Sequence, residues 1–135
     1  MDIRKFAVEE TGALDLVSAS DEPLIGDDGQ PMVIVLYGPG SKAYAKAQAA
    51  QQNRMIDKLK KKGKSDQTAE EKVREQAEFL AGCTQEFSAN ISYDDLKGDA
   101  LHRAVYADTS VGFIAEQVSK FLGDWSNFTK RSTTN

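Results

Sequence analysis

The residues Gly38-Pro39-Gly40-Ser41-Lys42 lie between a predicted strand and a predicted helix, where a chain could bind phosphate. Backbone N–H groups at the start of a helix attract anions, and a nearby lysine adds positive charge. In the phosphate-binding loop, however, the second glycine is followed directly by lysine and then by serine or threonine. Pro39 also lacks the N–H that a phosphate would use. We therefore favour a plain strand-to-helix turn, with nucleotide binding through Gly38–Lys42 as the alternative.

The other reactive residue types stand alone in the sequence. His102 is the only histidine and Cys83 the only cysteine, whereas a metal site needs several such ligands and a catalytic thiol needs a base beside it. The acidic loop residues lack the spacing of a calcium-binding loop, and the lysines suit the end of a helix. The sequence thus predicts a protein that is not an enzyme and holds no metal or cofactor. These acidic and basic residues are Asp21, Glu22, Asp27 and Asp28, and Lys58, Lys60, Lys61, Lys62 and Lys64.

Length and charge predict the broad class of the protein. A chain of 135 residues is expected to form one domain, residues 1–135, with enough core to fold without a disulfide. The net charge of −4 argues against nucleic acid as the main partner. The sequence shows neither a signal peptide nor a membrane-spanning run. We expect a soluble intracellular protein that does not bind membranes.

Apolar periodicity predicts a predominantly helical α+β fold. Short β-branched and aromatic runs indicate about three strands, and longer stretches with helical spacing indicate about four helices. The expected parts are a β-rich beginning at 1–37, a helical body at 41–128 and a flexible tail at 129–135. The predicted strands fall within 3–8, 13–17 and 32–37, and the predicted helices within 41–62, 68–88, 99–106 and 110–126.

The last predicted helix organises the expected core. From Ile114 to Phe128 its large apolar residues recur at offsets of 0, 4, 7, 8, 11 and 14 residues, which forms one stripe. The predicted helix at 68–88 begins with the capping box Thr68-x-x-Glu71 and continues as a seam of apolar residues at steps of 4, 3, 4 and 3 residues. The residues expected to share one core are Leu80, Phe87, Ile114, Val118, Phe121 and Trp125.

Two segments are candidates for binding other chains. The strand at 32–37 is apolar on both faces, so one face is expected to meet helices and the other a second copy of the chain. The alanine-rich helix at 41–62 could instead receive an amphipathic client helix, because small side chains permit a close approach. The same alanine face could equally pack inside the fold or the oligomer. The self-association residues are Val33, Val35 and Tyr37, and the client-binding residues are Tyr44, Ala47, Ala50 and Met55.

Three stretches together resemble a known protein family. They are LYGPGSKAYAKAQ at 36–48, SYDDLKGDALHRAVYAD at 92–108 and FIAEQVSKFLGDWSNF at 113–128. Their arrangement is similar to that of the tail assembly chaperones of long-tailed, non-contractile bacteriophages, from about residue 32 to residue 128. Members of that family are comparable in size and largely helical.

The resemblance implies a function without catalysis. Such chaperones bind the tape measure protein and keep it soluble while tail-tube subunits polymerise around it in the host bacterial cytoplasm. They are absent from the mature virion. Many are also made in a frameshift-extended form that recruits the major tail tube protein. The alternatives are a structural tail component, such as a tube or connector subunit, and the nucleotide-binding protein considered above.

Overall fold

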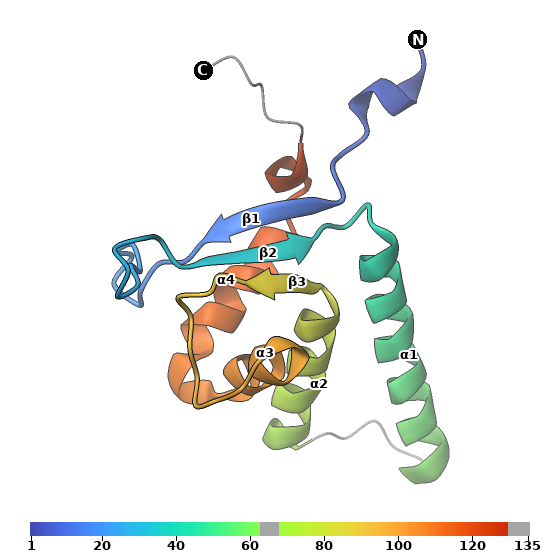
Figure 1. Cartoon of the computed structure of the whole chain (residues 1–135). Coiled ribbons are helices and arrows are strands. Elements are labelled where there is room, and N and C mark those ends of the chain that lie inside the picture. The colour runs from blue at the N-terminus through green and yellow to red at the C-terminus, as the bar shows by residue number, and fades with distance from the viewer. Residues whose placement is uncertain (63–67, 130–135) are drawn as a thin grey trace.

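A computed structural model describes residues 1–62 and 68–129, and within these ranges the chain has an α+β fold (Figure 1). A three-stranded antiparallel sheet is covered on one face by helices. Residues 63–67, between the first two predicted helices, and the predicted tail from residue 130 onward lie outside the described residues. The strands are β1 (Thr11–Asp15), β2 (Val33–Tyr37) and β3 (Thr84–Phe87), the helices are α1 (Lys42–Lys62), α2 (Ala69–Gly82), α3 (Gly98–Ala107) and α4 (Gly112–Leu122), and the short 3₁₀ turns are η1 (Ile3–Phe6), η2 (Thr109–Val111) and η3 (Trp125–Phe128).

The central strand β2 divides its side chains between two environments. It pairs with β1 on one side and β3 on the other. Ile34 and Leu36 are fully buried under the helices. Val33, Val35 and Tyr37 point to the opposite face and are only half-buried, because side chains alternate along a strand. The prediction of a doubly apolar strand at 32–37 is confirmed, and helices cover one of its faces.

The third strand comes from an unexpected place. The helix predicted over 68–88 ends at Gly82, and Thr84–Phe87 forms β3 beside β2. Thr84 and Phe87 do reach the core, but from a strand instead of a helical seam. The Thr84 hydroxyl donates to the Leu80 carbonyl at 2.7 Å, which satisfies one of the free carbonyls at the helix end. The apolar spacing of 4 and 3 residues that predicted a helix over 68–88 therefore continues beyond Gly82, where α2 ends.

The strand predicted at 3–8 is also wrong. Residues Ile3–Phe6 form η1, which begins where the Asp2 side chain accepts a hydrogen bond from the Arg4 N–H. Such an aspartate turn competes with extended structure. Asp108 and Asp124 begin η2 and η3 in the same way. At both residues, hydrogen bonds from Ser110 and Ser126, respectively, lower the pKa of the carboxyl.

The last helix is shorter than the stripe of apolar residues. α4 ends at Leu122, and Gly123 and Asp124 lead into η3. This turn buries Phe128, which is 1% exposed, and leaves Trp125 outside at 56% exposed. The prediction that Trp125 belongs to the core is therefore wrong. None of the helices in 1–62 and 68–129 has the length and apolar character needed to cross a bilayer.

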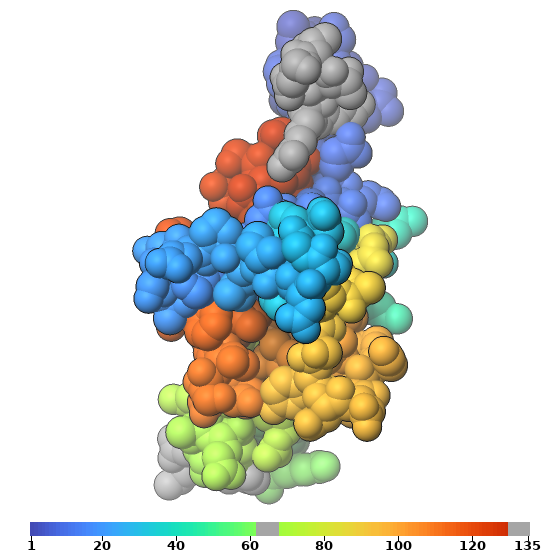
Figure 2. All heavy atoms as spheres, turned by 60° about the vertical axis from the view of Figure 1, so that its left-hand side comes forward, coloured from blue at the N-terminus to red at the C-terminus, as the bar shows by residue number. Residues whose placement is uncertain are grey.

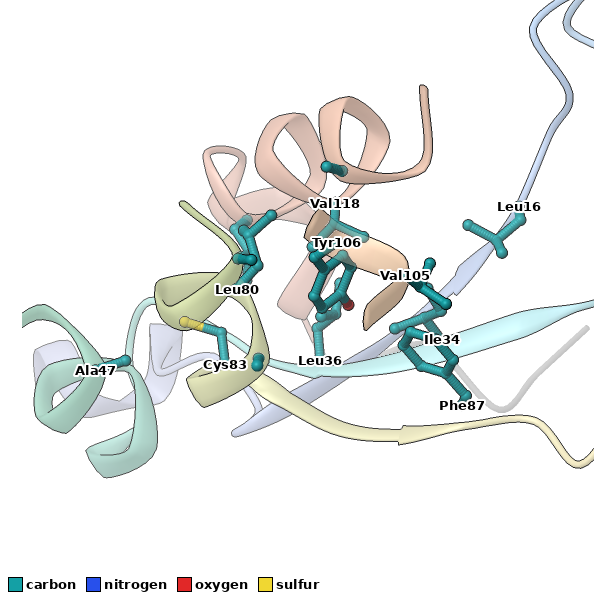
Figure 3. Packing of buried hydrophobic residues seen from close by; sticks show 14 of the residues in the cluster. Leu16, Ile34, Leu36, Ala47, Leu80, Cys83, Phe87, Val105, Tyr106 and Val118 are labelled. Carbon is teal, nitrogen blue, oxygen red and sulfur yellow. The ribbon is translucent and has the colours of Figure 1, made fainter. Parts of the chain in front are cut away.

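The core fills the space between the sheet and α2, α3 and α4 (Figure 3). Leu80, Phe87 and Val118 are buried there as predicted, whereas Ile114 and Phe121 are partly buried at its edge. The side chain of Gln117 holds α4 to the end of β1. The Gln117 amide accepts from the Val17 N–H at 2.8 Å and donates to the Val17 carbonyl at 2.7 Å. It thereby makes the two backbone hydrogen bonds that a neighbouring strand would make.

The buried polar contact of Tyr106 makes a testable contribution to stability. Because Thr84 donates its hydroxyl proton to Leu80, the Tyr106 hydroxyl is the donor in the 2.8 Å bond between Tyr106 and Thr84. Tyr106→Phe should lower the free energy of unfolding by about 1 kcal/mol, the usual net value of such a bond. Urea denaturation measures this loss. Tyr37→Phe, on the uncovered sheet face, is the matched control, and an equal loss in both variants would contradict the prediction.

Candidate functional site

The first half of α1 is held against α2. Ala47 is 7% exposed, and a Cβ built on Gly82 would lie 3.0 Å from the Ala47 Cβ. Tyr44 meets Phe79 edge to face, with ring centroids 5.6 Å apart. Of the four predicted client-binding residues, Ala47 is therefore inside the fold and Tyr44 and Ala50 are half-buried. Met55 alone of these four is exposed, at 45%.

Charged side chains hold the second half of α1 to α2. Arg54 donates from Nε to Glu75 at 2.9 Å, and Lys58 lies 3.4 Å from Glu75 and 3.5 Å from Glu71. Burial raises the pKa of Glu75, but the bonds from Arg54 and Lys58 outweigh it, and the net shift is downward. Glu75 therefore stays ionised at neutral pH and fixes one side of α1.

α1 carries three large apolar side chains that the described chain covers only in part, and Met55 among them borders the groove between α1 and α2. Met55, Ile56 and Leu59 are 45%, 48% and 46% exposed. Their spacing places them on one side of the helix, and we call these three residues the α1 stripe. Ile56 follows the buried Ala47 by nine residues, which is about two and a half helical turns, so it lies on the opposite side of α1. Ala45 and Ala49 are exposed on the same side of α1 as Ile56, so the residue types alone do not separate the exposed side from the packed one.

The second uncovered surface is the free side of the sheet. Register places Asp15 beside Val33, and Ala13 and Glu86 on either side of Val35. Thr11 lies beside Tyr37. We call these residues the open sheet face: Thr11, Ala13, Asp15, Val33, Val35, Tyr37 and Glu86. It brings the three predicted self-association residues together on one surface, with Asp15 and Glu86 exposed at its rim.

Hydrogen bonds and packing within the protein engage the turn at 38–42. The Gly38 N–H donates to the Glu10 carbonyl at 2.8 Å, and the Ser41 N–H donates to the Gly38 carbonyl at 3.0 Å. The Ser41 hydroxyl accepts from the Tyr44 N–H. The Phe128 ring fills the space beside Gly38, where an added Cβ would lie 2.4 Å from Cδ1. These contacts favour a structural turn over a nucleotide site.

Cys83 is buried among apolar side chains. It is 0% exposed, and burial raises the pKa of its thiol to about 12. The thiolate, which is the nucleophilic form, is therefore scarce at neutral pH.

His102 provides a pH-dependent contribution to stability. The residue is 6% exposed, and the centroid of its ring lies 4.4 Å from that of the Phe87 ring. Burial lowers its pKa, partly opposed by Asp99. Below the ordinary pKa of about 6.5, the unfolded chain binds a proton that the folded chain resists, so stability falls as pH falls. Stability should decrease from about pH 7.5 to about pH 5.5, a window that precedes carboxylate titration.

Urea denaturation at the two pH values measures the effect. Because His102 is the only histidine, the variant His102→Gln should show a flatter dependence on pH. An unchanged slope in this variant would contradict the assignment.

We compared the chain with family models, curated proteins and solved structures, and none of them matches it.

Proposed function

We propose that the protein is a non-catalytic tail assembly chaperone of a long-tailed, non-contractile bacteriophage. In this role it binds an amphipathic helical segment of the tape measure protein in the bacterial cytoplasm and keeps it soluble, and it does not enter the mature virion. The observation that carries the proposal is the α1 stripe, which exposes three large apolar side chains on a 21-residue helix. The resemblance of 36–48, 92–108 and 113–128 to such chaperones supplies the identity of the client.

The physical basis is the cost of leaving apolar surface in water. Met55, Ile56 and Leu59 are each about half exposed, and covering them with the apolar side of another helix recovers roughly 25 cal/mol for each Å² buried. Methionine adapts to clients of different shape. Lys60 is exposed beside the stripe, which favours a client segment with acidic residues at its edge. Binding alone draws the client away from aggregation, so the mechanism requires no ATP.

Co-expression with the tape measure protein tests the proposal. The unmodified chain should raise the soluble fraction of the tape measure protein, and Ile56→Glu should abolish most of that increase by placing a charge in the apolar contact. Gln85→Glu adds the same charge at an exposed position of β3, away from the stripe, and should leave the increase intact. Circular dichroism shows whether both variants stay folded.

Two outcomes would contradict different parts of the proposal. If Ile56→Glu retains full effect, the client binds elsewhere. If the unmodified chain does not bind the tape measure protein, the function itself is wrong. Substituting Ala47 would not separate these outcomes, because its side chain lies in the contact with α2.

The open sheet face favours a second candidate, a structural tail component such as a tube or connector subunit. Polymerising subunits commonly use exposed sheet surfaces to contact their neighbours. Mass spectrometry of purified virions separates the two candidates. A chaperone should be absent from the particles, whereas a tube or connector subunit should be present in many copies.

A further inference from the structure

The first seven residues form an exposed apolar arm. Residues 1–7 are all exposed, and η1 buries none of its side chains. Ile3 and Phe6 are 78% and 67% exposed. In Figures 1 and 2 these dark-blue residues stand away from the sheet and helices. Two large apolar side chains on such a segment gain little from the fold of their own chain and are available for a contact outside it.

The arm is anchored where it joins the body. The Glu9 N–H donates to the Phe128 carbonyl, and Val8 lies against Gly40. η3, which contains Phe128, lies on the helix-covered side of the sheet, since its residues contact Gly12 from the side that faces the core. This anchor directs the arm away from the open sheet face of its own chain. A second copy can receive the arm without breaking these contacts.

The open sheet face matches the arm in its apolar residues and is opposite to it in charge. Its middle is apolar, with Val33, Val35 and Tyr37, and its two exposed charged residues, Asp15 and Glu86, are acidic. Beside its apolar residues the arm carries the basic Arg4 and Lys5, with Arg4 paired to Asp2 at 2.7 Å. Opposite charges at the rim orient an apolar contact.

The length of the arm also agrees with the length of the strands in the open sheet face. With Ile3–Phe6 in η1 at about 2.0 Å per residue, and the other three residues extended at about 3.3–3.6 Å each, the arm spans roughly 18 Å. A five-residue strand is about 17 Å long. The arm is therefore long enough to cross the open sheet face beside β2. When two copies exchange arms reciprocally, each sheet face is covered and the contact closes with twofold symmetry.

We propose that the protein forms a dimer by exchanging these arms, so that Ile3 and Phe6 of one copy cover Val33, Val35 and Tyr37 of the other. Arg4 and Lys5 then lie near Asp15 and Glu86 of the partner copy. This inference is independent of the tape measure protein, because it uses neither α1 nor any client.

Light scattering of the full chain over a wide range of concentration is the first test. A dimer is expected, and the double variant Ile3→Ser with Phe6→Ser should be monomeric. Its thermal unfolding under dilute, monomeric conditions should match that of the unmodified chain, because both side chains are exposed. A chain that is monomeric at every concentration would overturn the proposal. So would a dimer that survives the double variant, which would indicate direct stacking of the two sheets.

Charge-reversal variants provide the matched control. One variant carries Arg4→Glu and Lys5→Glu, and the other carries Asp15→Lys and Glu86→Lys. Each variant alone brings like charges together and should be monomeric, whereas an equal mixture restores opposite charges at both contacts and should form a mixed dimer. Failure of the mixture to associate, or association of either variant alone as strongly as the unmodified chain, would contradict the assigned pairing.

Discussion

Replacing Phe128 with alanine should lower the free energy of unfolding by about 3–5 kcal/mol, the usual cost of removing a buried phenyl ring. The ring is 1% exposed and lies 5.2 Å from that of Phe121. It also fills the space beside Gly12 and Gly38, at the ends of the two strands β1 and β2. The loss should therefore exceed the transfer free energy of the ring, because the strand ends cannot collapse into the cavity. Urea denaturation followed by circular dichroism measures it.

Trp125→Ala is the control from the same turn. Trp125 has the larger side chain but is 56% exposed, and substitutions at such surface positions usually change stability by about 0.5 kcal/mol or less. A loss at Trp125 equal to that at Phe128 would contradict the prediction and show that both rings are buried.

Gly38→Ala should be the second most damaging of the predicted changes, with a loss of about 1–3 kcal/mol from overpacking. The new Cβ would lie 2.4 Å from Cδ1 of Phe128 and 2.6 Å from Cγ, distances that require the ring or the strand end to move. The effect is steric, so its size depends on whether the ring is present.

A double-mutant cycle isolates this contact. In the background of Phe128→Ala, the substitution Gly38→Ala should cost much less than in the unmodified chain, since the ring that obstructs the methyl group is gone. Contacting residues of this kind usually show coupling free energies of about 0.5–3 kcal/mol. Additive losses would contradict the packing of Phe128 on Gly38.

Local signals were sufficient for the positions of the helices. The alanine-rich run of α1 and the capping box at Thr68 both act within a few residues, and the Thr68 hydroxyl accepts from the Glu71 N–H at 3.1 Å. Local signals were also sufficient for β2, because β-branched residues in a short apolar run favour a strand. The predicted end of α2 at residue 88 was wrong, because Thr84 and Phe87 continue the helical spacing although they lie in β3.

The candidate surfaces depended more heavily on tertiary structure. The sequence distinguished the apolar residues of α1 from its alanines, but exposure was decided by the contact of Ala47 with Gly82. In β2, the alternation of side chains alone grouped Val33, Val35 and Tyr37 on one face. The helices α2, α3 and α4 cover the other face of the sheet. No local sequence pattern predicts their positions relative to the sheet.

The sequence by itself determined a helix-rich α+β chain and the location of α1 and β2. Only the tertiary structure decided that β3 completes the sheet, that Phe128 and not Trp125 enters the core, and that Ile56 is exposed. The physical reason is range. Capping and periodicity act between residues a few positions apart, whereas burial depends on contacts such as Gly38 with Phe128, which are distant in the chain and form only when the sheet and η3 meet.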